Sequence, residues 1–331
     1  MNELPFPKQP KFLCYHNKAF PVGVLEANIS KDITEWLCTK SVNCVFNSKS
    51  PKNKFDICIG DPWGVYDGFV KQQSVYLRKD LLHEFEFDLI SFLRNAIDND
   101  CYINGIYNEK YIPNKWAFQF ENYMHDYLLI GYDTDNFISV GFVFNGRFEK
   151  FKIPNECLLK SLLNNDSYRV GFELFSVNQN VEIIPNIQNM IMDLNNYIQS
   201  GFLNELPKSD VVYGISALKR LAMFFGEQNR NERPRIDMRY SRVLLEHEWI
   251  LNQVVALFFE DGSNKLIKEL SNRNYQLAQL VHMLGIKLEH SGNKQIINRV
   301  VAIMEDMIFN EINYIPQLIL ALQKRFSTYH K

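Results

Sequence analysis

The chain has 331 residues, of which 46% are hydrophobic and 14% aromatic, so it is long and apolar enough to bury a sizeable core. Its formal net charge of −2 lacks the basic excess of a general nucleic-acid binder, so no nucleic-acid partner is expected. No stretch approaches the roughly 18 apolar residues that cross a bilayer, and the N-terminus has no apolar signal core, so neither a membrane partner nor secretion is expected.

The cysteine pattern points to the same compartment. Six cysteines occur at positions 14, 38, 44, 58, 101 and 157, with no CxxC motif and no Cys/His cluster of zinc-ligand spacing. Such cysteines are expected to be reduced thiols in a cytoplasmic protein that holds no metal.

Helices and strands alternate in the first half of the chain. A short or broken helix is expected after Cys14, because Pro21 and Gly23 disturb it. Longer helices are expected at 24–38 and 84–98, and a short one at 154–163. Strands are expected at 75–77, at 101–113, in a hairpin over 124–146, at 146–153 and at 170–177. This order predicts an α+β fold in which an antiparallel sheet packs on helices.

From about residue 181 the pattern becomes helical. Periodic apolar segments lie near 186–200, 210–226, 237–261, 264–290 and 293–325, and Pro316 is expected to kink or break the last one. His247 falls in the middle of such a helix and is expected to be a packing residue. We therefore expect two domains, with the sheet in residues 1–180 and a mainly helical domain in residues 181–331.

Cys14 and His125 form the main candidate for chemistry. A thiol with a pKa of about 8.5 is mostly protonated at neutral pH, so its attack on an acyl group requires a neighbouring imidazole. His125 opens a strand 111 residues after Cys14, and this order matches papain-like folds, where a helix carries the cysteine and a sheet the histidine. The alternative is a buried core cysteine and a surface histidine. His16 is a second histidine candidate, ranked lower because no sheet orients it.

A third group should orient the imidazole of His125. With a two-residue turn at 134–135, the hairpin places Phe144 opposite His125, and Asn145 lies one step further along. Asp133 lies eight residues along the strand, about 26 Å away if the strand is extended. Both Asn145 and Asp133 are kept as candidates, beside a simple Cys–His pair.

An oxyanion hole needs the backbone N–H of Cys14 and one side-chain donor. Gln9, five residues upstream of Cys14, is the candidate donor. The alternative is a solvated loop glutamine.

Two segments carry a resemblance to a known family. They are LISFLRNAIDNDCYINGIYNEKYIP and HDYLLIGYDTDNFISVGFVFNGRFEKFKIP, which begin at Leu89 and His125. Together with Cys14 they resemble the butirosin-biosynthesis acyltransferase N-terminal family over about residues 10–160. This resemblance implies a papain-like, bacteriocin-peptidase-like cysteine-protease fold followed by a helical domain that acts as acceptor wall or lid.

The resemblance also implies a function. Members take an acyl group from a carrier-protein thioester onto cysteine and pass it to an amine in secondary-metabolite assembly. The implied partners are an acyl or peptidyl carrier protein and a small amine, such as a diamine, with no cofactor besides the phosphopantetheine that arrives on the carrier. The alternatives are a peptidase or thioesterase of the same fold, which uses water, and a non-catalytic binding protein.

The chain departs from the family's relatives at one position. Related peptidase-like folds often carry an aspartate about sixteen residues after the histidine, and here that position is Gly141. The third catalytic residue is therefore left open between Asn145, Asp133 and none.

Two further residues are candidates for substrate binding. Glu109 either faces the ammonium group of the acceptor or is an exposed turn residue. Arg239 is one of five arginines in the segment 230–242, a segment that either docks the phosphopantetheine arm or an acidic carrier, or forms a solvated loop-to-helix junction.

Overall fold

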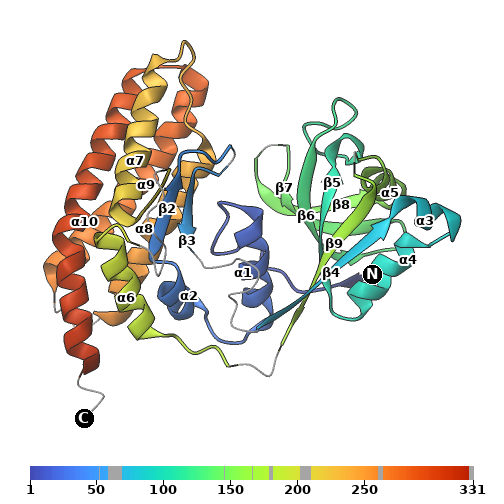
Figure 1. The fold of residues 1–331 in the computed structure, drawn as a ribbon, viewed down its shortest axis with the longest axis horizontal. Helices are drawn as coiled ribbons and strands as arrows, with labels where there is room; N and C mark the ends of the chain where they lie inside the picture. Colours follow the sequence, from blue (N-terminus) through green and yellow to red (C-terminus); the bar gives the residue numbers. More distant parts are fainter. Residues whose placement is uncertain are drawn as a thin grey trace. The chain divides into compact units, whose positions relative to one another are not determined.

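The computed structural model describes residues 1–51, 53–58, 69–144, 146–165, 167–178, 182–201, 210–259 and 264–327. Helices make up 53% and strands 21% of it, the sheets are antiparallel, and the C-terminal region is helical, which confirms the α+β class (Figure 1). The chain divides into two compact units. Unit 1 comprises residues 1–32 and 61–182, and unit 2 comprises residues 33–60 and 183–331.

Unit 1 is built on one antiparallel sheet in the order β4-β9-β5-β6-β7-β8, with β1 added alongside β6. Its strands are β1 (Asn2–Glu3), β4 (Val70–Arg78), β5 (Tyr102–Asn108), β6 (Met124–Tyr132), β7 (Asn136–Phe142), β8 (Phe148–Pro154) and β9 (Arg169–Val177). The β6–β7 hairpin agrees with the predicted hairpin, and each of its strands carries a continuous run of buried residues, 127–131 and 137–141.

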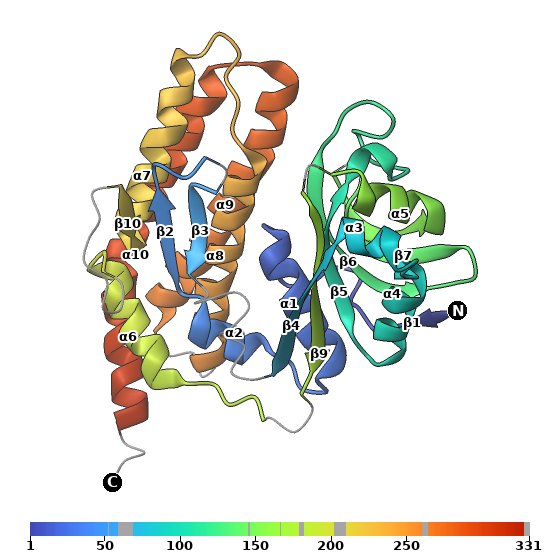
Figure 2. The same ribbon diagram turned by 45° about the vertical axis from the view of Figure 1, so that its right-hand side comes forward.

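Helices cover both faces of this sheet. They are α1 (His16–Asn28), α3 (Lys79–Glu84), α4 (Leu89–Asp98), the 3₁₀ turn η1 (Glu109–Tyr111) and α5 (Asn155–Leu163). Figures 1 and 2 show α1 on one side of the sheet and α4 and α5 on the other. Asp88 caps α4 by accepting the Ser91 N–H at 3.0 Å, and Leu89, Leu93 and Ile97 bury one stripe of the helix in the core.

Unit 2 is a helical assembly with a small antiparallel sheet. Its strands are β2 (Asn43–Asn47), β3 (Phe55–Cys58) and β10 (Val211–Tyr213), in the order β10-β2-β3. Its helices are α2 (Thr34–Lys40), α6 (Ile187–Ile198), α7 (Gly214–Glu227), η2 (Gln228–Arg230), α8 (Met238–Phe258), α9 (Lys265–Ser291) and α10 (Gln295–Ser327). The long helices α8, α9 and α10 correspond to three of the predicted periodic segments.

Several local predictions are corrected by the structure. The expected helix at 24–38 is two helices, α1 and α2, and the expected helix at 84–98 begins only at Leu89. Pro21 lies inside α1, and Pro316 lies inside an α10 that continues past it. A proline removes only one N–H donor, and the buried residues around each of these prolines hold the helix together.

The domain arrangement differs from a single boundary at residue 180. Residues 33–60 belong to unit 2, although they precede most of unit 1 in the chain. The cause is long-range pairing, since Val45 of β2 is paired with Tyr213 of β10. Among the described residues, no helix has both the length and the apolar character required to span a membrane.

Candidate active site

His125 lies at the beginning of β6, where the sheet register places it opposite Tyr107 of β5. Its side chain is 33% exposed, so a substrate can reach the ring. The Nδ1 atom lies 3.2 Å from Oε1 of Glu109 and 3.1 Å from the Tyr127 hydroxyl oxygen. With Glu109 as acceptor, Nδ1 carries the proton, and the lone pair on Nε2 is left to act as a base.

Glu109 is held behind His125 by the end of the neighbouring strand. It is the first residue of η1, which follows β5 directly, and its backbone N–H donates to the Tyr123 carbonyl at 2.8 Å. The side chain is buried and accepts a hydrogen bond from the Tyr127 hydroxyl. A buried carboxylate in this position is the arrangement that orients a catalytic imidazole.

Tyr127 and Lys115 surround the Glu109 carboxylate. Burial raises the pKa of Tyr127, and the Glu109 charge raises it further, so the hydroxyl stays protonated and donates. The Lys115 Nζ lies 3.9 Å from the centre of the Tyr127 ring and 3.7 Å from that of Phe151, and it donates to the Phe142 carbonyl at 2.6 Å. Burial lowers the pKa of Lys115 to about 7, against the opposing effect of Glu109.

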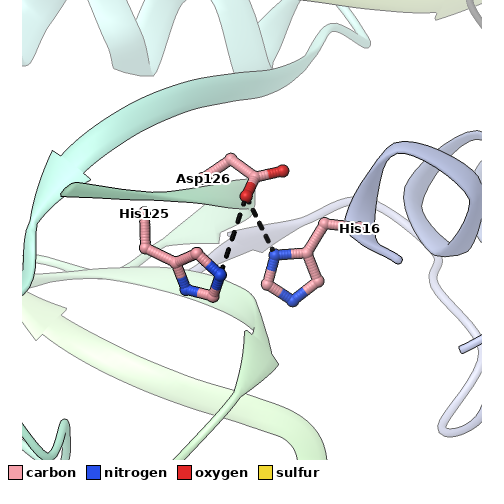
Figure 3. Close-up of side chains that lie close together, drawn as sticks. All are labelled: His16, His125 and Asp126. Atoms are coloured by element: carbon pink, nitrogen blue, oxygen red, sulfur yellow. Dashed lines mark hydrogen bonds and ion pairs between the residues drawn. The ribbon is translucent and has the colours of Figure 1, made fainter. Parts of the chain in front are cut away.

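His16 and Asp126 lie on the other side of the His125 ring (Figure 3). The centres of the two imidazole rings are 4.8 Å apart. His16 Nδ1 lies 3.3 Å from Oδ1 of Asp126, and His125 Nε2 lies 3.9 Å from the same oxygen, beyond hydrogen-bond distance. The ring of His16 also stacks between Phe20 and Phe142.

The charges of this second pair follow from its burial. Burial lowers the pKa of His16, and the hydrogen bond to Asp126 opposes this effect only in part. Burial alone would raise the pKa of Asp126, but the hydrogen bond from His16 and the charges of both imidazoles bring it below its ordinary value. A neutral His16 therefore donates from Nδ1 to an ionised Asp126.

Cys14 lies two residues before His16, next to Tyr15, the N-cap residue of α1. It is 4% exposed, and the N-terminus of a helix stabilises a thiolate. The centre of the His16 ring lies 4.8 Å from that of His125, so Cys14 is two residues along the chain from a side chain that neighbours the base candidate. The pairing of Cys14 with His125 stays a prediction.

Asp133 is not brought to His125. It lies just beyond the opposite end of β6, where its carboxylate accepts hydrogen bonds from Lys152 Nζ at 2.6 Å and from the Asn136 backbone at 2.8 Å. The hydrogen bond from Lys152 lowers the pKa of Asp133 most, and the hydrogen bonds from Asn136 lower it further. Asp133 therefore closes the hairpin turn. Asn145 lies outside the described residues.

The hairpin register differs from the predicted one. The predicted pairing holds near the turn, where Gly131 is opposite Ile138, but an irregularity follows at Ile130, and Leu128 is then opposite Val140. The register shifts by one residue in the direction opposite to the shift that would place position 145 across from His125.

The space beside the α-carbon of Gly141 is filled by neighbouring side chains. This is the position at which the related peptidase-like folds often carry an aspartate. A Cβ atom there would lie 2.7 Å from the Tyr127 ring and 3.5 Å from His16, and the residue has a φ of +155°. The space next to position 141 is thus filled by the tyrosine that donates to Glu109. The carboxylate behind His125 comes from the end of β5 instead.

The remaining predicted residues lie away from this cluster or have other partners. Gln9 is exposed in a bend before α1, and no described contact tests it as an oxyanion donor. Arg239 lies in the first turn of α8 in unit 2, where its Nε atom donates to both Asp237 oxygens, at 3.0 and 3.1 Å. Glu109 is not an exposed turn residue, because it is buried against His125. Its contact with an acceptor amine stays a prediction.

A pocket of about 490 Å³ lies beside Lys115. Its lining includes Lys150 and Lys152, but these are paired with Glu3 at 2.5 Å and Asp133 at 2.6 Å. The pairing offsets the positive charge, so the pocket is not a strong anion site.

Sequence reasoning missed four members of the cluster: His16 as a close neighbour, Asp126, Tyr127 and Lys115. Asp126 follows His125 directly, and in a regular strand consecutive side chains point to opposite faces. At the strand end, however, Oδ1 of Asp126 lies 3.3 Å from His16 Nδ1 and 3.9 Å from His125 Nε2. The usable signal was Tyr127, which lies two residues after His125 and so shares its face.

The cluster permits two kinds of chemistry. Glu109 and His125 form an oriented base. His16, His125 and Asp126 hold ligand atoms within 4.8 Å of one another and so are able to bind a metal ion. A comparison with protein-family models finds no match to this chain, and a comparison with curated proteins finds none either. The resemblance drawn from the sequence segments thus stays a prediction.

Proposed function

We propose that this protein is a cysteine-dependent acyltransferase that forms an amide bond, with Cys14 as nucleophile, His125 as base and Glu109 as the residue that orients the base. The observation that carries the proposal is the 3.2 Å contact between His125 Nδ1 and the buried Glu109 carboxylate, beside the helix end that follows Cys14. The sheet and α1 are compatible with a papain-like fold, in which a cysteine at a helix start faces a histidine on a strand.

The proposed reaction has two half-reactions. His125 Nε2 takes the Cys14 proton, the thiolate attacks the carrier thioester, and the carrier thiol leaves with that proton as the acyl–Cys14 bond forms. An amine then attacks the acyl carbon and loses a proton to His125, and Cys14 leaves as a thiol. Glu109 stabilises the imidazolium present between these steps. The donor is an acyl or peptidyl carrier protein, and the setting is cytoplasmic natural-product biosynthesis.

The test measures both the product and the fate of the acyl group. Purified protein is incubated with an acyl N-acetylcysteamine thioester, with or without a panel of amines that includes a diamine. Amide formation that is lost in Cys14→Ala, but kept in the control Cys101→Ala, supports the proposal. Release to water at a rate independent of amine indicates a thioesterase or peptidase. The absence of any turnover or adduct indicates a binding protein.

A metal-dependent hydrolase is the second candidate. The observation that favours it is the group His16, His125 and Asp126, two imidazoles and one carboxylate with ligand atoms within 4.8 Å. In that case Glu109 would orient His125 as a ligand instead of a base, which is a common role for a carboxylate behind a metal-binding histidine. Hydrolysis that requires added Zn²⁺ and survives Cys14→Ala would favour this candidate.

A further inference from the structure

A second polar cluster lies in the core of unit 2, and the proposed function uses none of its residues. His247 and Glu248 are consecutive residues of α8, and Glu311 lies on α10. All three are 0% exposed. An ionised carboxylate in such surroundings has a high free-energy cost unless a cation or several hydrogen bonds compensate it.

The hydrogen bonds of His247 leave one nitrogen directed at a carboxylate. Nε2 lies 3.1 Å from the Val42 carbonyl oxygen, so it donates there and carries the ring proton. Nδ1 then holds a lone pair, has no hydrogen-bond partner among the described residues, and lies 3.6 Å from Oε1 of Glu248. Two lone pairs that face each other in a dry core need a positive charge between them.

The two carboxylates are treated differently by their neighbours. Glu311 accepts a hydrogen bond from the Tyr197 hydroxyl and one from the Asn274 amide at 3.4 Å. Asn274 is itself fixed, since its carbonyl accepts from Asn310 at 2.8 Å. Glu248 lies next to Glu311 and Asn274, yet neither of its oxygens has a hydrogen bond of ordinary geometry among the described residues. Burial raises the pKa of Glu248, and contacts with Glu311 and Asn274 lower it somewhat against this effect, but Glu248 is compensated less well than Glu311.

The positions of the ligand atoms suit a metal ion. One nitrogen of His247 and one oxygen from each glutamate lie within 4.8 Å of one another. Ligands with bonds of about 2.0–2.2 Å to a tetrahedral metal are about 3.3–3.6 Å apart. The 3.6 Å between His247 Nδ1 and Glu248 Oε1 already matches this separation, and the other ligand atoms would draw together on binding. The hydrogen bond from His247 Nε2 to a backbone carbonyl is also the usual support of a metal-binding histidine.

We propose that His247, Glu248 and Glu311 bind one divalent first-row transition-metal ion in the core of unit 2. One imidazole and two carboxylates suit Zn²⁺, Mn²⁺ or Fe²⁺. The ion connects α8 to α10, and Tyr197 and Asn274 orient the Glu311 ligand. Its role is structural, because all three side chains are closed off from solvent.

The competing arrangement is a pair of carboxyl groups that share protons. Burial raises the pKa of Glu248 to about 7, and burial together with Glu248 raises the pKa of Glu311, so protonated forms are available to both. The two arrangements differ in what glutamine does. Glu248→Gln removes a metal ligand, but it closely mimics a protonated carboxyl group.

The experiment uses the full-length protein. The protein is purified without added metal, and its metal content is measured by elemental mass spectrometry. The chelator-treated protein is then titrated with Zn²⁺ and with Mn²⁺ while its melting temperature is measured. We expect about one equivalent per chain and a higher melting temperature with metal. Glu248→Gln and Glu311→Gln should each weaken metal binding at least 100-fold. Glu305→Gln, an exposed change on α10, should bind as the wild type does.

His16→Gln serves as a second control, because it alters the candidate metal group of unit 1 and leaves this one intact. If a glutamine variant does not fold, the titration of the chelator-treated wild type still decides. The proposal is overturned if the wild type binds neither metal, or if Glu248→Gln binds as tightly as the wild type. It is equally overturned if His16→Gln alone removes the bound equivalent.

Discussion

His125 Nδ1 lies 3.2 Å from Oε1 of Glu109, a residue that is only 2% exposed. The two residues come from neighbouring strands, since Glu109 follows the end of β5 and His125 begins β6. An imidazole held by a buried carboxylate has one defined tautomer and one defined orientation. In the proposed mechanism, this contact supplies the third member that the sequence left open.

Replacing Glu109 should therefore damage catalysis more than binding. We expect Glu109→Ala to lower kcat by about 10²–10⁴-fold, because His125 loses the partner that fixes its tautomer. KM should change little. The measurement is steady-state acyl transfer to an amine. Asp133→Asn is the matched control, because that carboxylate serves the hairpin turn, and it should keep kcat within a few-fold. Equal losses of kcat in both variants would show that Glu109 does not orient His125 for catalysis.

His16 distinguishes the thiol reaction from the metal reaction. In the cysteine mechanism His16 donates a hydrogen bond to Asp126 and packs on Phe20, so His16→Gln should keep transfer within about tenfold and leave the metal content unchanged. Elemental analysis and transfer kinetics on the same preparation provide the test. Loss of one metal equivalent together with all activity would show that His16 is a ligand of a catalytic metal.

Lys115 should make stability depend on pH. Burial lowers its pKa from 10.5 to about 7, so above pH 7 the folded protein has released a proton that the unfolded chain keeps. The free energy of unfolding therefore rises with pH, by about 2 kcal/mol between about pH 7 and 8.5. Urea unfolding at several pH values measures this rise. Lys115→Met should abolish it, whereas Lys71→Met, a change at an exposed position of β4, should not. An unaltered slope in Lys115→Met would be inconsistent with a neutral buried lysine.

Gly141 should not tolerate a side chain. Gly141→Ala places a Cβ atom 2.7 Å from the Tyr127 ring at a φ of +155°, and we expect a loss of about 1–3 kcal/mol in the free energy of unfolding. Gly226→Ala is the control. Gly226 lies within α7, and the nearest atom to an added Cβ is Cγ2 of Val301 at 3.6 Å, so this change should be neutral or stabilising. Thermal melts compare the two. An unchanged melting temperature in Gly141→Ala would indicate that Tyr127 moves aside easily.

Periodicity predicted much of the fold, because burial of one face leaves a local record in the chain. Strands β5 to β9 and the long helices of unit 2 fall where the apolar spacing places them. The placement of residues 33–60 left no such record, since it depends on the pairing of β2 with β10, which is more than 160 residues further along the chain. A local pattern cannot encode which distant strand completes a sheet.

Only part of the candidate site could be predicted from the sequence. His125 and Cys14 could be chosen from their residue types and their order. The role of Glu109 could not, because it depends on the β5–β6 register that places Tyr107 opposite His125. The proximity of His16 to Asp126 likewise depends on how α1 packs against the start of β6.

The most direct test of the Cys14–His125 pair is single-turnover acylation followed by peptide mapping. Full-length protein is mixed with an acyl N-acetylcysteamine thioester, and the acylated peptide is identified at successive times. We predict one acyl group per chain on Cys14, none in Cys14→Ser at that position, and acylation at least 100-fold slower in His125→Ala. Amide formation without a Cys14 adduct, or the same acylation rate in His125→Ala as in the wild type, would contradict the account.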